Sequence, residues 1–277
     1  INDLPEGWSS YQQFAAANHK FTMFDFDWNF AKSYTFWAGL VGGMFLSMAT
    51  HGADQLMIQR YLGAKNQKDA ARALGFSGFL VFAQFALFLL LGVALAAFYA
   101  TFPPVTPFEK PDEVFASFII DHLPVGVKGL TLAAVFAAAM STLSSSLSST
   151  TSALVNDFHL PLTSTHKQQS ELVSLSRIFT ALFGCAQIAV GIASQSISSS
   201  VVGSVLAIAG ISTGLILGIF FLATFSRQAS QASALLGFVI GLTVVLYVAF
   251  AMKQEVAWPW YTLIGATTVF AVGILGS

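Results

Sequence analysis

Long, nearly uncharged apolar blocks constrain this chain more than any other feature of its sequence. A helix needs about 20 mostly apolar residues to cross the hydrocarbon core of a bilayer. Lipid-exposed backbone must form its hydrogen bonds within a helix or a closed barrel, and residues 79–98 lack the alternating polarity of barrel strands. We therefore expect an all-α integral membrane fold with roughly seven transmembrane helices. The blocks run roughly over residues 33–50, 75–101, 129–154, 172–195, 200–225, 232–252 and 259–276.

The small number of charges supports this expectation and excludes several classes of function. Charged residues make up 9% of the chain, against about 25% in soluble domains. The net charge of −1 excludes a basic nucleic-acid surface, and the single Cys185 excludes an internal disulfide. The five histidines show no HExxH spacing, and no nucleophile elbow or phosphate loop is found. We therefore expect no enzyme, no catalytic residues, no organic cofactor and no nucleic-acid partner.

The distribution of basic residues among the loops predicts the orientation in the membrane. When the loops are assigned alternately to two sides, all four arginines fall on the side of residues 54–74, 156–171 and 226–231. Basic loops remain cytoplasmic, so we expect these three loops inside and residues 1–32 as an extracellular loop.

Two of the loops should contain short helices of their own. Residues 55–73 have the pattern of a cytoplasmic helix with a turn at Gly63. Residues 112–122 have the pattern of an external amphipathic helix, which Asp112 could cap and which Pro124 would end.

The first motif that could carry chemistry closes the block 33–50. This block is short, contains three glycines and ends in the polar run Thr50 to Gln55. A short, glycine-interrupted apolar segment is typical of a broken transporter helix, whose unpaired backbone groups can hold a solute or an ion. Ser47, Thr50 and His51 would then point into the gap. The alternative is an ordinary helix end at the cytoplasmic surface.

The second motif is a row of small and hydroxyl residues within the block 129–154. On a helix, four of its residues share one face at spacings i, i+3, i+4 and i+7; they are Ala138, Ser141, Thr142 and Ser145. Hard cations such as sodium prefer oxygen ligands, and Ser144 with Ser145 could serve a second ion. The alternative is close helix packing through small residues. Packing is also the favoured interpretation of a third motif, Gly210 to Gly214.

Four segments together resemble the sodium/solute symporter family, which includes the sodium/glucose cotransporters. Residues 51–62 resemble the end of the sixth core helix of that family. Residues 123–130 and 137–145 resemble its eighth core helix, and residues 156–158 match the signature that follows. The order of these segments identifies the chain as the C-terminal half of such a protein, and hence as a piece of a longer chain.

The resemblance implies a fold and a set of domains. The fold is the second inverted repeat of a LeuT-type fold plus about two additional helices. Residues 33–225 would form the second five-helix repeat of the transporter core, and residues 226–277 the additional transmembrane helices.

The resemblance also implies binding residues. The main sodium site, the metal site of the family, would use the carbonyl of Ala138 and the hydroxyls of Ser141 and Thr142, and a second sodium would use Ser144 and Ser145. The solute site would be lined by Ser47, Thr50 and His51. Sugar transporters of the family carry other side chains at the first two of these positions and a Gln where Leu206 stands here, which puts sugar in doubt as the solute.

The implied function is sodium-coupled secondary active symport of a small organic solute or anion by alternating access, with Na⁺ as the coupling ion. The expected location is the plasma membrane, as a multi-pass protein. The expected partners are the solute, the sodium ion, the lipid bilayer and the missing N-terminal half. Two alternatives remain open at this point: a membrane sensor or scaffold built on the symporter core, and an intramembrane enzyme.

Overall fold

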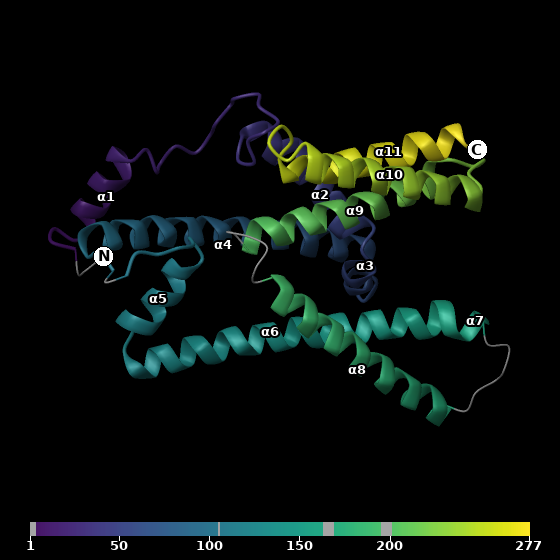
Figure 1. The fold of residues 1–277 in the computed structure, drawn as a ribbon, viewed down its shortest axis with the longest axis horizontal. Helices are drawn as coiled ribbons and strands as arrows, with labels where there is room; N and C mark the ends of the chain where they lie inside the picture. Colours follow the sequence, from purple (N-terminus) through teal and green to yellow (C-terminus); the bar gives the residue numbers. More distant parts are fainter. Residues whose placement is uncertain (1–3, 105, 163–168, 195–200) are drawn as a thin grey trace. The chain divides into compact units, whose positions relative to one another are not determined.

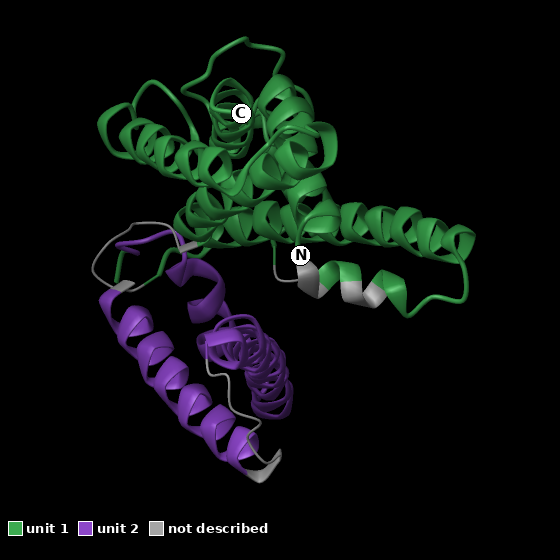
Figure 2. Cartoon of the chain, turned by 90° about the vertical axis from the view of Figure 1, so that its right-hand side faces the viewer, with its two compact units in different colours: residues 1–107, 200–277 green, residues 108–199 purple. Residues whose placement is uncertain are grey.

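The computed structural model describes residues 4–104, 106–162, 169–194 and 201–277, and these residues form helices and connecting loops without strands. The chain divides into two compact units, one of residues 1–107 with 200–277 and the other of residues 108–199 (Figure 2).

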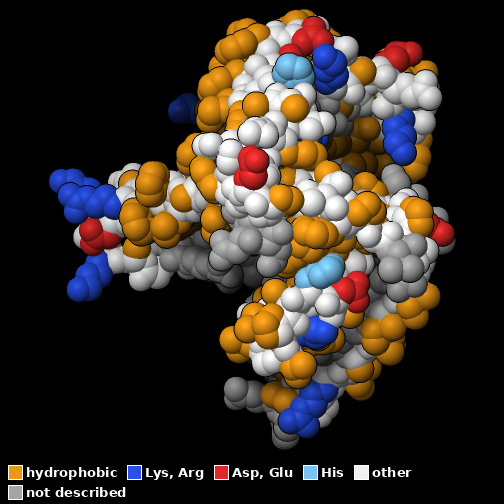
Figure 3. Space-filling view, turned by 90° about the vertical axis from the view of Figure 1, so that its left-hand side faces the viewer, with side chains coloured by type: hydrophobic (Ala, Val, Ile, Leu, Met, Phe, Trp, Pro, Cys, Tyr) orange, Lys and Arg blue, Asp and Glu red, His pale blue; other side chains and the backbone are white. Residues whose placement is uncertain are grey.

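Six helices are long and apolar enough to cross a membrane within the described part of the chain. Their charged residues are few, and their apolar side chains are largely exposed, as on α4, where Phe76, Phe79, Phe82 and Phe85 are 63–68% exposed. Figure 3 shows hydrophobic side chains over much of the visible surface, with charged side chains in a few places. This surface suits lipid, and the chain is a multi-pass membrane protein. The six helices are α4 (Gln67–Thr101), α6 (Val125–Ala153), α8 (Gln169–Ser194), α9 (Val201–Phe225), α10 (Gln231–Ala251) and α11 (Tyr261–Leu275).

The first apolar block of the sequence does not form a helix of this length. It forms a π-helical turn, η1 (Ala38–Gly42), followed directly by α2 (Gly43–Gly52). These two elements contain 15 residues, which rise about 22 Å and fall short of the roughly 30 Å hydrocarbon core. The expected count of roughly seven spans therefore corresponds here to six long helices and one short one.

The core of the first unit is the helix group α9, α10 and α11, which lie side by side in Figure 1. Glycines allow the close approach: a Cβ atom on Gly214 of α9 would lie 2.8 Å from the carbonyl oxygen of Thr262 on α11. The hydroxyl of Thr262, which is 1% exposed, donates to the carbonyl of Gly210 over 3.2 Å. The packing interpretation of the motif 210–214 is confirmed.

Two further parts of the first unit pack against long helices. Ala49 of α2 is buried with Leu217 of α9 and Ala266 of α11, so the short helix lies against this helix group. The helix α1 (Trp8–Ala17) packs on α4 through Tyr11 and Ala97. The segment expected as an external loop over residues 1–32 thus contains a helix. Its side of the membrane and the domain boundaries at residues 32 and 225 stay predictions.

Local sequence explains where several helices begin. The side chain of Asn66 accepts from the backbone of Asp69 and starts α4, and Ser230 forms a capping box with Ser233 at the start of α10. The helix α3 (Gln55–Leu62) is followed by the turn predicted at Gly63.

The second unit contains α5, α6 and α8, with a π-helical turn, η2 (Leu154–His159), and the short α7 (Leu160–Leu162) after α6. The helix expected over 112–122 is α5 (Glu113–His122); Asp112 occupies its N-cap position without a capping hydrogen bond from its side chain. Helices α6 and α8 cross (Figure 1), and their described residues share two polar contacts. These are a 3.1 Å contact between the hydroxyls of Thr151 and Thr180 and a 3.2 Å hydrogen bond from Gln187 to Ser146.

Candidate functional site

The five residues predicted to bind sodium lie on consecutive turns of α6, and their side chains are exposed in the described structure. The hydroxyl of Thr142 donates to the carbonyl of Ala138 over 3.1 Å, and the hydroxyl of Ser145 donates to the carbonyl of Ser141 over 3.0 Å. The hydroxyl protons of Thr142 and Ser145 are thus used within the helix. The lone pairs of each hydroxyl oxygen remain available to accept from, or to coordinate, a group outside the helix.

The helix therefore presents neutral oxygen atoms at an uncovered face. In the described residues no group of three or more His, Cys, Asp or Glu side chains comes close enough to hold a metal ion. A cation bound at this face of α6 would thus be held by hydroxyl and carbonyl oxygens, a donor set that suits a hard monovalent cation better than a transition metal.

The three residues predicted to line the solute site lie on the last turns of α2. Ser47 is exposed, while Thr50 and His51 are half-buried. The hydroxyl of Thr50 donates to the carbonyl of Leu46 over 2.9 Å. The Nδ1 atom of His51 lies 2.6 Å from the hydroxyl of Tyr61, which is on α3. This last contact was not predicted from the sequence, because the two residues are ten positions apart.

The helix ends directly after these residues, as both interpretations of the sequence pattern allow. The backbone N–H groups of Ala53 and Asp54 both donate to the carbonyl of Ala49, over 3.0 and 3.1 Å. The carbonyl of Asp54 then accepts from the N–H groups of Met57 and Ile58 and starts α3. The end of α2 is therefore a break between two helices, where backbone groups leave the regular helical pattern.

The structure brings together the members of each predicted set, the sodium set on α6 and the solute set on α2. The two sets belong to different compact units. Their roles as sodium-binding and solute-binding residues stay predictions.

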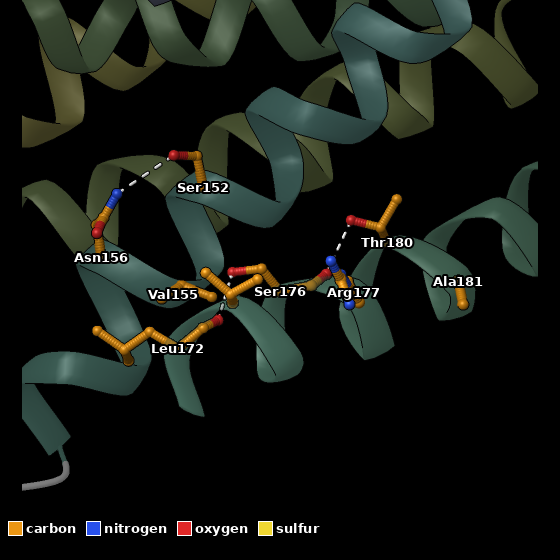
Figure 4. Close-up of a pocket in the computed structure, with 9 residues that line it drawn as sticks. Ser152, Val155, Asn156, Leu172, Ser176, Arg177, Thr180 and Ala181 are labelled. Carbon is orange, nitrogen blue, oxygen red and sulfur yellow. Dashed lines mark hydrogen bonds between the residues drawn. The ribbon is translucent and has the colours of Figure 1, made fainter. Parts of the chain in front are cut away.

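The second unit contains a pocket of about 650 Å³ that was not predicted from the sequence (Figure 4). Some hydroxyl and amide groups of its lining form hydrogen bonds with residues four positions away in the chain. Asn156 donates to Ser152 over 3.3 Å, and Ser176 donates to the carbonyl of Leu172 over 2.8 Å. Arg177 is the charged residue of the lining. Polar residues four positions apart, Ser152 with Asn156 and Ser176 with Thr180, were the sequence pattern that could have indicated this pocket. The lining residues are Ser152, Val155, Asn156, Leu172, Val173, Ser176, Arg177, Thr180 and Ala181.

A second pocket, of about 830 Å³, lies in the first unit beside η1. Aromatic side chains that include Phe24, Phe36 and Trp258 line much of it. Next to it, the ammonium group of Lys32 lies 2.7 Å from Asp27 and 3.6 Å from Asp25. The hydrogen bond with Asp27, together with the charges of both carboxylates, raises the pKa of Lys32. For residues 1–32, the sequence predicted only an extracellular loop.

A family model described as "Sodium:solute symporter family" matches residues 12–241. The sodium/sialic acid symporter NanT of Aliivibrio fischeri is 30% identical over 261 residues, which cover 94% of this chain and 51% of the relative. The human sodium/iodide cotransporter is 28% identical over 246 residues, which cover 84% of this chain and 37% of the relative. This chain thus spans about half of the length of the first relative, and less of the second.

A solved structure of the substrate-bound, outward-open state of a Na⁺-coupled sialic acid symporter has a similar fold. The TM-score is 0.75 at 24% identity, and the match covers 97% of this chain and 55% of the other. The match confirms the expected fold class, an all-α membrane fold of the LeuT type.

Proposed function

This chain belongs to the sodium:solute symporter family, and from that premise we propose that it is the C-terminal half of a sodium-coupled symporter of a small anionic solute. The whole transporter would include an N-terminal half and would act in the plasma membrane. The names of several relatives support an anion as solute, since they specify sialic acid, iodide and monocarboxylates.

The arrangement of oxygens on α6 carries this proposal. The carbonyl of Ala138 and the hydroxyls of Ser141 and Thr142 lie on adjacent turns, and the internal hydrogen bond of Thr142 leaves its lone pairs free for a cation. Sodium would bind to these three oxygens together with ligands from the N-terminal half. Ser144 and Ser145 would contribute to a second sodium site.

Coupling then follows from linkage between the two ligands. If sodium binds better to the state that binds solute, each ligand raises the affinity for the other by the same factor, and a tenfold factor corresponds to about 1.4 kcal/mol. The membrane potential adds about 2.3 kcal/mol per charge per 100 mV to accumulation. Alternating access would move the sodium ligands of α6 apart from their partners and release the ion.

The test is uptake by the full-length protein in proteoliposomes, with an inward sodium gradient and labelled sialic acid, iodide or pyruvate as probe. We expect the replacement Thr142→Val to reduce sodium-dependent uptake at least about tenfold, because valine keeps the shape and removes the oxygen. Ser141→Ala should act in the same direction.

Thr131→Val is the matched control. Thr131 lies on the same helix, and its hydroxyl donates to the carbonyl of Val127 over 2.9 Å in the same manner. It is outside the proposed site, so its loss should leave sodium dependence unchanged. Full sodium dependence in both Ser141→Ala and Thr142→Val would refute the proposed site, and absence of uptake of every probe by the unaltered protein would refute the transport function.

A further inference from the structure

One polar contact in the first unit has no role in the proposed sodium site. It joins the end of α2 to α3 across the break at Ala53 and Asp54, through the 2.6 Å contact between Nδ1 of His51 and the hydroxyl of Tyr61. Both side chains are half-buried, and their ring centroids lie 6.2 Å apart. Because it uses one side chain from each helix, this contact fixes where the imidazole ring lies relative to the break.

The same contact fixes the hydrogen-bonding character of the ring. A phenol O–H is a stronger donor than a neutral imidazole N–H, so the favoured arrangement has Tyr61 donating to Nδ1. The proton of the neutral ring is then on Nε2. If the ring is protonated instead, Nδ1 donates to the phenol oxygen and Nε2 again carries a proton. In both states Nε2 presents an N–H group, and no described residue forms a hydrogen bond with Nε2.

We propose that Tyr61 is a positioning residue, which holds His51 as an Nε2 hydrogen-bond donor at the helix break, and that this donor recognises an acceptor atom of the solute. The inference rests on the proposed function, since it takes His51 to line the solute path. The proposal restricts the solute to molecules that can place a hydrogen-bond acceptor beside Nε2 of His51, such as a carboxylate or another anion. Tyr61 itself does not touch the solute.

The first measurement tests the tautomer and does not depend on transport. The full-length protein is labelled with ¹⁵N-histidine, and its solid-state NMR spectrum is recorded in lipid at about pH 8, where an ordinary histidine is neutral. The signal of His51 is the one absent from the variant His51→Phe. In the unaltered protein this signal should show a protonated Nε2 and an unprotonated Nδ1 that accepts a hydrogen bond. In Tyr61→Phe it should shift toward a mixture of tautomers, and an unchanged signal would overturn the proposal.

The second measurement is a double-mutant cycle on uptake, with whichever of sialic acid, iodide or pyruvate the unaltered protein accumulates with sodium. Tyr61→Phe and His51→Phe each remove hydrogen-bonding atoms and keep an aromatic ring. We expect Tyr61→Phe to raise the solute KM about three- to tenfold with little change in maximal rate, as the loss of one hydrogen bond allows. In the His51→Phe background, the same change at Tyr61 should have no further effect.

Tyr247→Phe on α10, where the side chain is 63% exposed, is the matched control and should leave KM unchanged. Equal effects of Tyr61→Phe with and without His51 would show that Tyr61 acts on stability alone, and the proposal would be wrong. The same conclusion follows if the NMR signal shifts but KM does not. Absence of sodium-dependent uptake in the unaltered protein would instead remove the proposed function, and the solute role of His51 with it.

Discussion

Helices α9 and α11 of the first unit and helix α6 of the second unit all contain small and hydroxyl residues, but those where α9 meets α11 are buried between helices, whereas those of the predicted sodium set on α6 are exposed. In the first unit, Thr262 is 1% exposed and its hydroxyl donates to a carbonyl on another helix. In the second unit, Thr142 is exposed and its hydroxyl donates to a carbonyl of its own helix. The first arrangement holds two helices together, whereas the second leaves an oxygen at an open face. Small and hydroxyl residues therefore do not by themselves distinguish packing from binding; the neighbouring helix does.

The largest effect on stability is expected from a methyl group added where α9 meets α11. In Gly214→Ala, the new Cβ would lie 2.8 Å from the backbone oxygen of Thr262 and 2.9 Å from its Cα, and backbone atoms cannot rotate away. Even after the better helix propensity of alanine, we expect the free energy of unfolding to fall by about 2 kcal/mol. The thermal midpoint of the full-length protein in detergent measures this change.

Gly129→Ala on α6 is the control for that comparison. Nothing lies within 4 Å of a Cβ atom at Gly129, so this change should be neutral or stabilise by up to about 1 kcal/mol. An equal loss of stability in both variants would show that α6 is covered as closely as α9, and the difference between the two regions would disappear.

A smaller effect is expected when the hydroxyl between α9 and α11 is removed. Thr262→Val loses the 3.2 Å hydrogen bond to the carbonyl of Gly210 and should lower the free energy of unfolding by about 1 kcal/mol. Thr267→Val, on the same helix but exposed, should change it little, since that hydroxyl bonds only to carbonyls of its own helix. Sodium-dependent uptake should survive both changes. A loss of sodium dependence in Thr262→Val would show that the buried hydroxyl also serves the ion.

The sequence predicted those features of this molecule that depend on residues close together in the chain. Apolar length predicted the six long helices, and the spacing of Ser141 and Thr142 placed both on one face of a helix. The polar run from Thr50 to Gln55 predicted that a helix ends there. Each of these follows from helical geometry alone.

The features that the sequence did not predict depend on how helices meet. The contact between His51 and Tyr61 exists because the chain turns between two helices, and the pocket that contains Arg177 exists because α6 and α8 cross. Neither outcome can be inferred from the spacing of residues along one helix.

The smallest effect is expected from the charges beside the second pocket, which differ from both helix regions because they form ion pairs between half-exposed side chains. The carboxylates of Asp27 and Asp25 raise the pKa of Lys32 above its usual value of 10.5. A folded-state pKa above the unfolded value means that the interaction stabilises the protein below about pH 10.5 and is lost as the pH rises further. We expect Lys32→Met to lower the thermal midpoint slightly at pH 8. This difference should vanish as the pH rises past the raised pKa of Lys32, and it should shrink in high salt because exposed ion pairs are screened. A difference that persists under both conditions would mean that the aliphatic part of Lys32 stabilises this segment by packing, as the buried side chains of α9 and α11 do.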